Sequence, residues 1–307
     1  MTTNNVQDSL GSFRYDTSGT WFRGNMHIHS VMSDGGKTFQ ELAEMYAAEG
    51  YHFLYRTDHW VISDVRSDAN SYPLLWLDGV ELDGYDKHGG EYHVVCLGTF
   101  TGISREMGFE TALNATRNQG GVLILAHPHW MGNTLEEALR WPFDGAEVYN
   151  HGCHFGNGKG EGGVYWHAML AERPDVLGFA ADDAHINTED AVWNGGWIVV
   201  NVPELSRSAI NGAVQAGNFY SSCGPDFQSI ELVGDDVVIT CSPVRDVWMV
   251  GPRSAGERSK APKGGLITEA RFKIPTDWPY VLLEIEDADG RLAWTNTLFT
   301  PRTGSMR

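Results

Sequence analysis

The stretch NMHIHS at residues 25–30 decides how the rest of this chain is interpreted. Because side chains in a strand repeat every second residue, His27 and His29 project from one face, while Met26 and Ile28 point into apolar packing. Two imidazoles on one face can hold a metal ion. On its own, however, a His-x-His pair is better explained by chance or by hydrogen-bonded core histidines.

Similar groups of side chains recur along the chain. They are Thr57-Asp58-His59, Gly79-Val80-Glu81, Glu91-Tyr92-His93, Ala126-His127-Pro128-His129 and Asp182-Asp183-Ala184-His185. Most of these groups stand at the C-terminal end of a short apolar run, where a parallel α/β barrel carries its functional residues. So many independent coincidences are improbable, and we expect the groups to form one metal site.

Composition bounds the class of protein. With 307 residues and 42% hydrophobic content, the chain can build one large barrel, or a domain of about 200 residues plus a smaller one. No apolar run approaches the roughly 18 residues of a membrane span, and residues 1–8 lack a secretion pattern. We therefore expect a soluble, cytoplasmic protein without a membrane partner.

Charge and cysteine usage exclude two further classes. The formal net charge of −18 and the lack of a basic cluster argue against binding a nucleic-acid backbone. Cys96, Cys153, Cys223 and Cys241 are scattered without a C-x-x-C pair, which argues against a disulfide framework or a thiolate zinc site. We expect buried thiols.

The pattern divides the chain into three parts. Residues 1–20 lack periodicity and predict a tail or a covering strand. Residues 21–218 alternate short apolar runs with amphipathic segments, which is typical of an α/β barrel, and the six glycines of 152–163 predict a flexible loop or lid beside its rim. Residues 219–307 contain strands and hairpin turns, and predict a small antiparallel β domain.

Four motifs in this order resemble the PHP (polymerase and histidinol phosphatase) family of metal-dependent phosphoesterases. They are His27-x-His29 with Asp34-Gly35, Thr57-Asp58-His59, Ala126-His127-Pro128 and Asp183-x-His185, and the resemblance runs over about residues 21–220. It implies an α/β fold, a distorted parallel (β/α)7-type barrel, here with a C-terminal β extension. Residues 219–225 and 292–296 further resemble the branch that includes carbaryl-hydrolase-like enzymes.

The resemblance also implies a set of metal ligands. His27, His29, Glu81 and Asp183 would hold one ion, Glu81 would bridge to a second held by His93 and His127, and Asp34, His59 and His185 would hold a third. Six imidazoles and three carboxylates suit zinc, manganese or iron. We therefore expect two or three divalent ions, with a bridging hydroxide as the nucleophile.

Three residues next to these ligands are candidates for supporting roles. Asp58 and Asp182 could fix imidazole tautomers, or could make ordinary capping and rim hydrogen bonds. His129 lies two residues after His127, and could donate a proton to the leaving group or simply pack against its neighbour.

Two arginines are candidate phosphate ligands. Arg56 precedes Thr57-Asp58-His59, where the family normally has a small or apolar residue, and it could reach a substrate phosphate or form a salt bridge with one of the many carboxylates. Arg207 could clamp a phosphate, or could be a surface residue at the start of a helix.

These features favour a metal-dependent hydrolase of a small phosphate ester, with a small-molecule ester as its partner. The alternative is a carbamate or carboxylic ester hydrolase that uses the same ions, because few basic residues stand near the motifs to bind a phosphate dianion. A non-catalytic metal-binding module ranks last, since it predicts eroded ligands and every expected position carries a competent donor.

Overall fold

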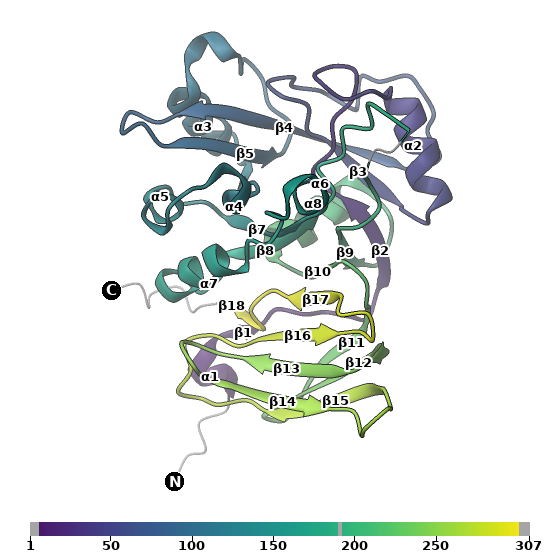
Figure 1. Ribbon diagram of the computed structural model, residues 1–307, viewed down its shortest axis with the longest axis vertical. Coiled ribbons are helices and arrows are strands. Elements are labelled where there is room, and N and C mark those ends of the chain that lie inside the picture. Colours follow the sequence, from purple (N-terminus) through teal and green to yellow (C-terminus); the bar gives the residue numbers. More distant parts are fainter. Residues whose placement is uncertain (1–5, 190–191, 301–307) are drawn as a thin grey trace.

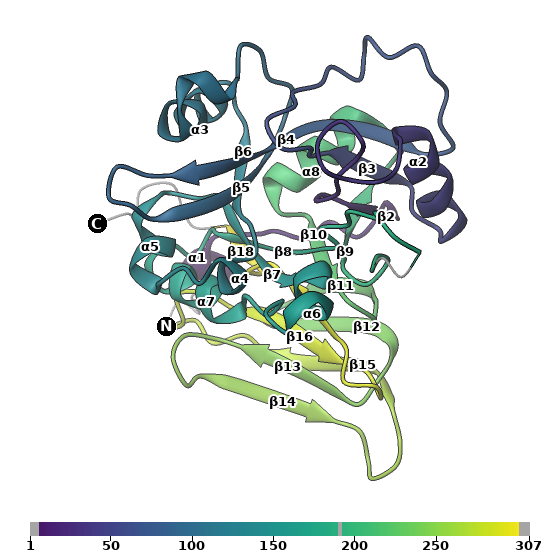
Figure 2. The same ribbon diagram turned by 45° about the horizontal axis from the view of Figure 1, so that its top comes forward.

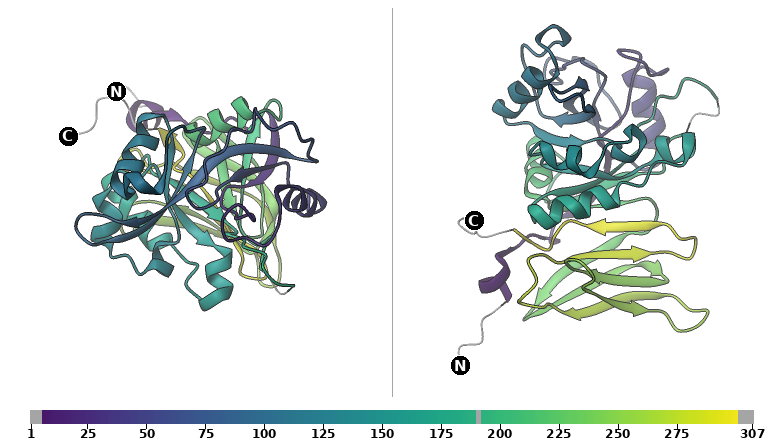
Figure 3. Two further views of the ribbon diagram at one scale, coloured as in Figure 1. Left: turned by 90° about the horizontal axis from the view of Figure 1, so that it is seen from above. Right: turned by 60° about the vertical axis from the view of Figure 1, so that its left-hand side comes forward.

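The computed structural model describes residues 6–189 and 192–300. Figure 1 shows two parts stacked along the long axis, an upper part of helices and strands and a lower part built almost entirely of strands. The right-hand view of Figure 3 shows the lower strands as layers beneath the upper part. The predicted order of an α/β region followed by a β-rich region is therefore observed.

A sheet of thirteen strands runs through both parts. In spatial order its strands are β14 (Gly256–Lys260), β13 (Asp246–Val250), β16 (Leu282–Glu286), β17 (Leu292–Thr295), β10 (Phe219–Ser222), β9 (Trp197–Val202), β2 (Thr20–Asn25), β3 (Phe53–Arg56), β4 (Leu75–Tyr85), β5 (Glu91–Leu97), β6 (Val122–Leu125), β7 (Gly145–Asn150) and β8 (Leu177–Ala181). The apolar runs that predicted strands in residues 21–218 thus lie side by side in one sheet.

The predicted all-parallel arrangement is only partly correct. Strands β2, β3 and β4 are mutually parallel, and so are β6, β7 and β8, but β5 is antiparallel to both of its neighbours. The reason is the short turn between β4 and β5, where the amide of Asp86 donates to the carbonyl of Gly90. A hairpin this short reverses the chain, whereas parallel neighbours require a long crossover.

The ends of β2 and β8 meet although these strands are not neighbours in the sheet order. The amide of Asp183 donates to the carbonyl of His27 (2.9 Å), and the amide of His29 donates to the carbonyl of Ala184 (3.0 Å). Ile28 and Ala184 form an isolated parallel bridge. The sheet therefore curves enough to bring its two parallel triplets together at one end.

Helices cover the outside of this curved sheet, with α3 packed on β4, α7 on β7 and α8 on β9 (Figure 2). Their bounds are α1 (Val6–Leu10), α2 (Phe39–Ala48), the 3-10 turn η1 (Arg105–Met107), α3 (Phe109–Asn118), α4 (Pro128–Met131), α5 (Leu135–Arg140), α6 (His151–Asn157), α7 (Gly163–Glu172) and α8 (Arg207–Ala216). Within the described ranges, no helix is both long enough and apolar enough to cross a bilayer.

Local capping explains where several helices begin. Thr38 and Thr134 form capping boxes with Glu41 and Glu137 at the starts of α2 and α5. Helix α6 occupies the first half of the segment that glycine content predicted to be a loop. The side chain of Asn150 accepts a hydrogen bond from the Cys153 amide and starts this helix, so a good N-cap outweighs the weak helix propensity of glycine there.

The C-terminal strands form a second layer. Strands β11 (Phe227–Val233), β12 (Asp236–Val244) and β15 (Ile267–Lys273) make an antiparallel sheet. Burial alternates along β12, and Val237, Ile239 and Cys241 join one apolar cluster with residues of β13 and β16. The two sheets therefore pack face to face, as the period-two pattern of this region predicts.

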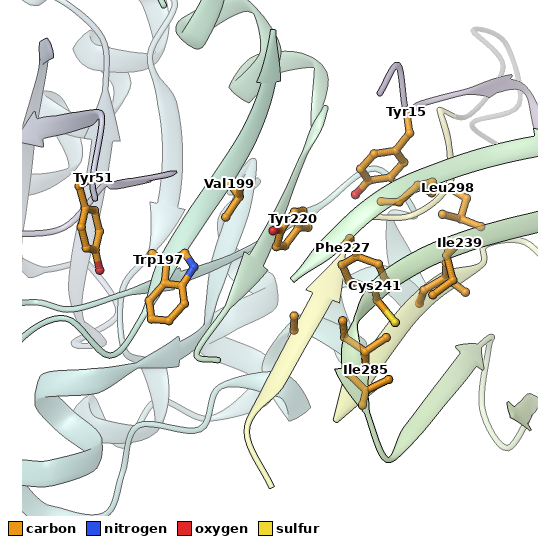
Figure 4. Close-up of a cluster of buried hydrophobic side chains, with 14 of the residues drawn as sticks. Tyr15, Tyr51, Trp197, Val199, Tyr220, Phe227, Ile239, Cys241, Ile285 and Leu298 are labelled. Carbon is orange, nitrogen blue, oxygen red and sulfur yellow. The ribbon is translucent and has the colours of Figure 1, made fainter. Parts of the chain in front are cut away.

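The two parts share one core. Figure 4 shows Tyr51 and Trp197 from the upper part in the same buried cluster as Ile239 and Ile285 from the lower part, with Tyr220 of β10 between them. Strand β10 pairs with β9 on one side and with β17 on the other. Strand β10 therefore joins the two parts, and the domain boundary at residue 219 stays a prediction.

The N-terminal segment covers this junction. Strand β1 (Ser12–Phe13) pairs with β18 (Phe299–Thr300) near the other end of the chain. The hydroxyl of Tyr15 donates to the carbonyl of Phe219 (2.8 Å) and accepts from the amide of Asn296 (2.7 Å). For residues 1–20, predicted as a tail or a covering strand, the described part contains helix α1 and the two-residue strand β1, and residues 1–5 lie outside the described ranges.

Candidate metal centre

All nine predicted donors gather at one end of the curved sheet. They follow β2, β3, β6 and β8, or lie on β4 and β5. Because β5 runs antiparallel to β4, its first residues lie beside the last residues of β4, which brings His93 to the same edge as Glu81. The four sets of ligand atoms that lie within 4.8 Å of one another are His29, Asp34, His59 and His185; His27, Glu81 and His127; His27, His29 and Asp183; and His59, Glu81 and His93.

Glu81 stands at the middle of this cluster. Its Oε2 lies 3.1 Å from Nε2 of His27 and 3.2 Å from Nε2 of His29, while its Oε1 lies 2.8 Å from Nδ1 of His93. His59 and His127 approach the same carboxylate at 3.4 and 3.5 Å. One carboxylate thus faces imidazoles on both of its oxygens, which is the arrangement that a bridging ligand needs.

Asp183 is the second shared carboxylate. Its Oδ1 lies 3.2 Å from Nε2 of His27 and 3.1 Å from Nε2 of His29, and its Oδ2 lies 3.7 Å from Nε2 of His127. Asp34, which is more exposed, lies 3.2 Å from Nε2 of His185.

The observed grouping differs in several ways from the set implied by the resemblance, because Glu81 groups with His27 and His127 and, separately, with His59 and His93, and His29 joins the group of Asp34. Nδ1 of His29 lies 3.4 Å from Oδ1 of Asp34, so His29 contacts both the buried carboxylates and the more exposed group.

Divalent ions would satisfy the donor atoms better than hydrogen bonds among these atoms do. Nε2 of His27 and Oε2 of Glu81 are buried without a hydrogen-bond partner among the described residues, although they face each other at 3.1 Å. Buried polar atoms are rarely left unpaired, because each costs about 1–3 kcal/mol. A cation between them would satisfy both atoms, and a mixed nitrogen and oxygen set suits first-row divalent metals.

The electrostatics of the cluster favour positive charge. Burial lowers the pKa of His29, but hydrogen bonds to Asp183 and Glu81 outweigh it and raise that pKa to about 9. Burial raises the pKa of Glu81, but the neighbouring charge of His27 and hydrogen bonds from the imidazoles hold it well below its ordinary value. Protons on the imidazoles therefore partly offset the carboxylate charge that metal ions would otherwise offset.

Glu147 is a functional residue that sequence reasoning missed. Its Oε1 accepts from Nδ1 of His27 (2.7 Å), and its Oε2 accepts from the amide of His127 (2.7 Å) and from the side chain of Asn150 (2.8 Å). It thereby leaves Nε2 of His27 free to face the cluster. The available signal was its place near the end of an apolar strand, where period two directs it to the same side as the donors.

Asp83 supports a second imidazole. It lies two residues after Glu81 on β4, and its Oδ1 is 3.1 Å from Nδ1 of His59, while Arg105 holds its other side at 2.9 Å. The alternation Glu81-x-Asp83 could have predicted it. Burial raises the pKa of this carboxyl, but hydrogen bonds from His59 and Arg105 outweigh burial and lower it.

Asp58 and Asp182, the candidates for fixing imidazole tautomers, form hydrogen bonds with other groups. Asp58 accepts from the amide and hydroxyl of Ser30 (both 2.8 Å) and from the hydroxyl of Ser33 (2.7 Å). Asp182 accepts from the hydroxyl of Tyr46 and from the amides of residues 194–196. Both correspond to the alternative of ordinary rim hydrogen bonding, because each side chain points away from the imidazoles and into a loop.

His129 lies outside the cavity. It is an exposed residue of α4, and because successive residues of a helix are about 100° apart, it faces away from His127. The prediction assumed a continuing strand after residue 126, which would have kept the two histidines on one side. Pro128 instead opens a helix at its first position.

The two arginines also lie outside the cavity. Arg56 is buried against Phe39 (4.1 Å to the ring centroid) and pairs with Asp68, which is the salt-bridge alternative. Arg207 is exposed at the start of α8, and its Nε donates to the carbonyl of Trp76 (3.0 Å). Neither guanidinium reaches the donors.

Backbone strain is concentrated around the same end of the sheet. Trp60, His127, Asp183 and Ile186 have positive φ angles of 58°, 29°, 51° and 36°. Such conformations cost about 1–3 kcal/mol each in residues other than glycine, and they tend to cluster at functional sites. Packing and hydrogen bonds elsewhere in the fold hold these residues where their side chains meet.

The donors open into a cavity of about 540 Å³. Besides several donors, its walls contain Trp130, Gly152, Cys153, Phe155, Gly156, Ile186, Asn187, Thr188 and Val192. Among the described residues that form these walls there is no lysine or arginine. The cavity therefore offers imidazoles, carboxylates and apolar surface to a ligand.

Comparison with solved structures finds a related architecture in a two-domain protein from Bacteroides vulgatus ATCC 8482, which contains a predicted PHP-like metal-dependent phosphoesterase. The match has a TM-score of 0.53 and 15% sequence identity, and covers 92% of this chain and 97% of that one. This chain has the PHP-like fold. The resemblance inferred from the four ordered motifs is thus confirmed at the level of the fold.

The other matches are more distant. An amidohydrolase from Chromobacterium violaceum matches with 19% identity and a TM-score of 0.43, over 64% of this chain and 96% of that one. A phosphoribosyl 1,2-cyclic phosphate 1,2-diphosphodiesterase from Eggerthella lenta is 30% identical over 82 residues, which is 25% of this chain and 31% of that protein. No protein-family model matches this chain, and the carbaryl-hydrolase branch stays a prediction.

Proposed function

We propose that this protein is a metal-dependent hydrolase that cleaves a small phosphate ester at a site of two or three divalent ions. The observation that carries the proposal is the cluster of nine nitrogen and oxygen donors around Glu81, at the floor of a 540 Å³ cavity. The PHP-like fold supports the same function.

The donor positions suggest how the ions would be held. His27, His29 and Asp183 would hold one ion, and Asp34, His59 and His185, together with His29, would hold another. Glu81 belongs to two further groups, one with His27 and His127 and one with His59 and His93, and would share an ion with the donors of these groups. Bound there, divalent ions would supply Lewis-acid stabilisation of the charge that grows on an attacked ester, together with an activated water. Manganese, zinc and iron all suit this donor set.

The chain's own residues prepare the site. Glu147 fixes the tautomer of His27, and Asp83 restrains His59, so both imidazoles direct their Nε2 atoms to the cluster. The apolar walls formed by Trp130, Phe155 and Ile186 reduce the water around a bound ester. Lower solvation strengthens the electrostatic interactions that lower the barrier.

The walls favour a phosphate diester over a monoester. A diester carries one negative charge, whereas a monoester is a dianion for which cationic side chains are normally provided, and the described walls contain no lysine or arginine. The name of the Eggerthella lenta relative, a diphosphodiesterase, agrees with a diester. The same lack of cations supports the second candidate, a neutral carbamate or carboxylic ester.

A metal-reconstitution experiment tests the proposal. The protein is stripped with a chelator, reloaded with manganese, zinc or iron, and assayed with aryl phosphate monoesters, diesters, carbamates and acetates. We expect activity to return only with metal and to be highest on diesters. Turnover of carbamates or acetates alone would replace the first candidate by the second, and a loaded protein inactive on every ester would refute both.

A further inference from the structure

Two aromatic side chains break the burial pattern of this protein. The chain has 11 tryptophans and 13 phenylalanines, and within the described ranges only Trp130 and Phe155 are exposed, at 42% and 64%. Both line the metal cavity, although they come from different elements, α4 and α6. Large exposed aromatics beside a cavity usually mark a binding surface, because folding alone would bury them.

Trp130 is held against the donors themselves. Its ring lies edge-on to the imidazoles of His127 (5.1 Å between centroids) and His93 (6.1 Å), and its amide donates to the carbonyl of His127. A ligand group that reaches the ions beside Glu81 therefore has this indole as a neighbour.

Phe155 lines the same cavity from helix α6. Its ring lies 4.8 Å from that of His151 and 5.7 Å from that of His154, and the neighbouring Gly156 has open space where a side chain would start. Ile186 and Val192 add further apolar surface to the cavity. The walls therefore present flat, uncharged surface to the part of the ligand that is not bound to metal.

The same cavity lacks an independent proton donor. Apart from the predicted metal ligands, the described wall residues include one titratable side chain, Cys153. Its thiol is buried and donates to Oδ2 of Asp183 (3.9 Å), so its proton is directed at this carboxylate. His129, the expected donor, lies outside the cavity. A leaving group in this site must therefore depart without help from a general acid among these residues.

We propose that Trp130 and Phe155 form an aromatic subsite for a planar, uncharged leaving group, and that the protein acts on aryl esters whose oxygen departs as a stabilised anion. This inference rests on the proposed hydrolase function and names its substrate class. The oxygen of water forms a bond to phosphorus, and the bond from phosphorus to the aryl oxygen breaks. That oxygen keeps the electron pair and leaves as a phenoxide, while the proton of water passes to solvent.

The kinetic test compares two esters through the ratio of their kcat/KM values. The intrinsic reactivity of each ester is the same for every variant, so it cancels when the ratios of two variants are compared. We measure kcat/KM for phenyl methyl phosphate and for trifluoroethyl methyl phosphate, and compare the ratio of the two between variants. Trp130→Ala and Phe155→Ala should each lower the phenyl preference about tenfold, the scale expected for loss of one aromatic contact with its buried area. Trp130→Phe should retain most of it. Trp248→Ala, in β13 of the C-terminal layers, is the control and should leave the ratio unchanged.

A binding test needs no catalysis and no metal. Titration calorimetry on the metal-free protein compares the monomethyl esters of phenylphosphonic and methylphosphonic acid. We expect about tenfold tighter binding of the phenyl compound, abolished by Trp130→Ala. Circular dichroism verifies that each variant is folded. Both aromatic side chains are exposed, so their replacement should not disturb folding. If Trp130→Ala nevertheless does not fold, Phe155→Ala and Trp130→Phe still test the subsite.

The outcomes separate this inference from the proposed function. A metal-loaded protein that hydrolyses both esters with a ratio insensitive to Trp130 and Phe155 would overturn the aromatic subsite and leave the hydrolase intact. A protein that hydrolyses neither ester, yet binds the phenyl phosphonate more tightly through Trp130, would overturn the hydrolase and keep the subsite. A shallow dependence of kcat/KM on the acidity of substituted phenols would contradict departure without a general acid.

Discussion

The donor-bearing end of the sheet and the C-terminal β layers are built on opposite principles. The layers alternate buried and exposed residues, as along β12, and their interior is apolar. The donor end buries His27, His29, His127 and Glu81 within one cluster, and several of its residues have positive φ. Apolar packing therefore supplies the stability of this fold. The donor end costs free energy, because it holds buried polar groups and residues with positive φ, and a bound cation would lower that cost.

The largest expected effect is at the donor end. Glu81→Gln should lose two of the bound ions and lower kcat/KM roughly 10²- to 10³-fold, since removing one partner of a buried charged pair costs about 3–5 kcal/mol. Elemental analysis and the reconstitution assay measure both. Glu231→Gln, at an exposed position of β11, is the matched control. Unchanged metal content in Glu81→Gln would show that this carboxylate is not a bridge.

The C-terminal layers should respond in the opposite way. Ile239→Ala removes a fully buried side chain, and should lower the free energy of unfolding by about 2–5 kcal/mol while leaving metal content and kcat/KM of the folded protein unchanged. Urea unfolding monitored by circular dichroism, with elemental analysis of the folded fraction, checks this. Loss of metal at low urea would mean that the two regions are energetically coupled through their shared core.

A smaller effect is expected at Glu147, which contacts a donor histidine but is not itself a predicted metal ligand. Glu147→Gln should weaken metal binding about 10- to 100-fold, the usual cost of losing a carboxylate that orients a ligand histidine. The reason is that its Oε1 holds Nδ1 of His27 at 2.7 Å. Competition with a metal-sensitive dye measures the affinity. Asp58→Asn should change it less, because Asp58 bonds to Ser30 and Ser33, and an equal effect would restore Asp58 as an imidazole partner.

Metal affinity should rise with pH. Hydrogen bonds to carboxylates raise the pKa of His29 to about 9 in the metal-free protein, so this imidazole carries a proton at neutral pH. A metal binds the neutral imidazole, and the proton must leave. Between about pH 6.5 and pH 9 the affinity should therefore rise up to tenfold per pH unit for each proton released. Calorimetry in buffers of different ionisation enthalpy counts the protons, and an affinity independent of pH would argue against the raised pKa.

The smallest effect is expected from an arginine far from the cavity. Arg207→Ala should change kcat/KM by no more than about twofold and stability by about 0.5 kcal/mol, as for other surface substitutions. Its Nε donates to the carbonyl of Trp76, and its side chain is exposed. Steady-state kinetics on a diester suffices. A tenfold rise in KM would reinstate Arg207 as a phosphate ligand.

Several features of the fold follow from local patterns. Helix α2 is one of the amphipathic segments of residues 21–218: Phe39, Leu42, Ala43 and Tyr46 stand at helical spacing, and the last three are buried. Apolar runs before His59 and His127 predicted β3 and β6. These predictions succeed because helix and strand periods are properties of neighbouring residues.

Other features depended on contacts between distant segments. The antiparallel direction of β5 is set by the short turn between β4 and β5. The short helix α4, which carries His129, is set by the few residues that follow β6. The sequence left the partners of Asp58, Asp182 and Arg56 open between alternatives, because a side chain's partner is set by whichever segment packs beside it. Sequence spacing carries no information about that neighbour.

By itself, the sequence determined the chemistry of the donors, since six imidazoles and three carboxylates at strand ends are residue identities joined to a two-residue period. Tertiary structure alone decided that Glu147 orients His27, that β10 joins the strands of the α/β part to the C-terminal layers, and that Trp130 and Phe155 line one cavity. The physical reason is that these relations join segments distant in the chain, and only the packing of the whole core brings such segments within hydrogen-bonding or van der Waals distance.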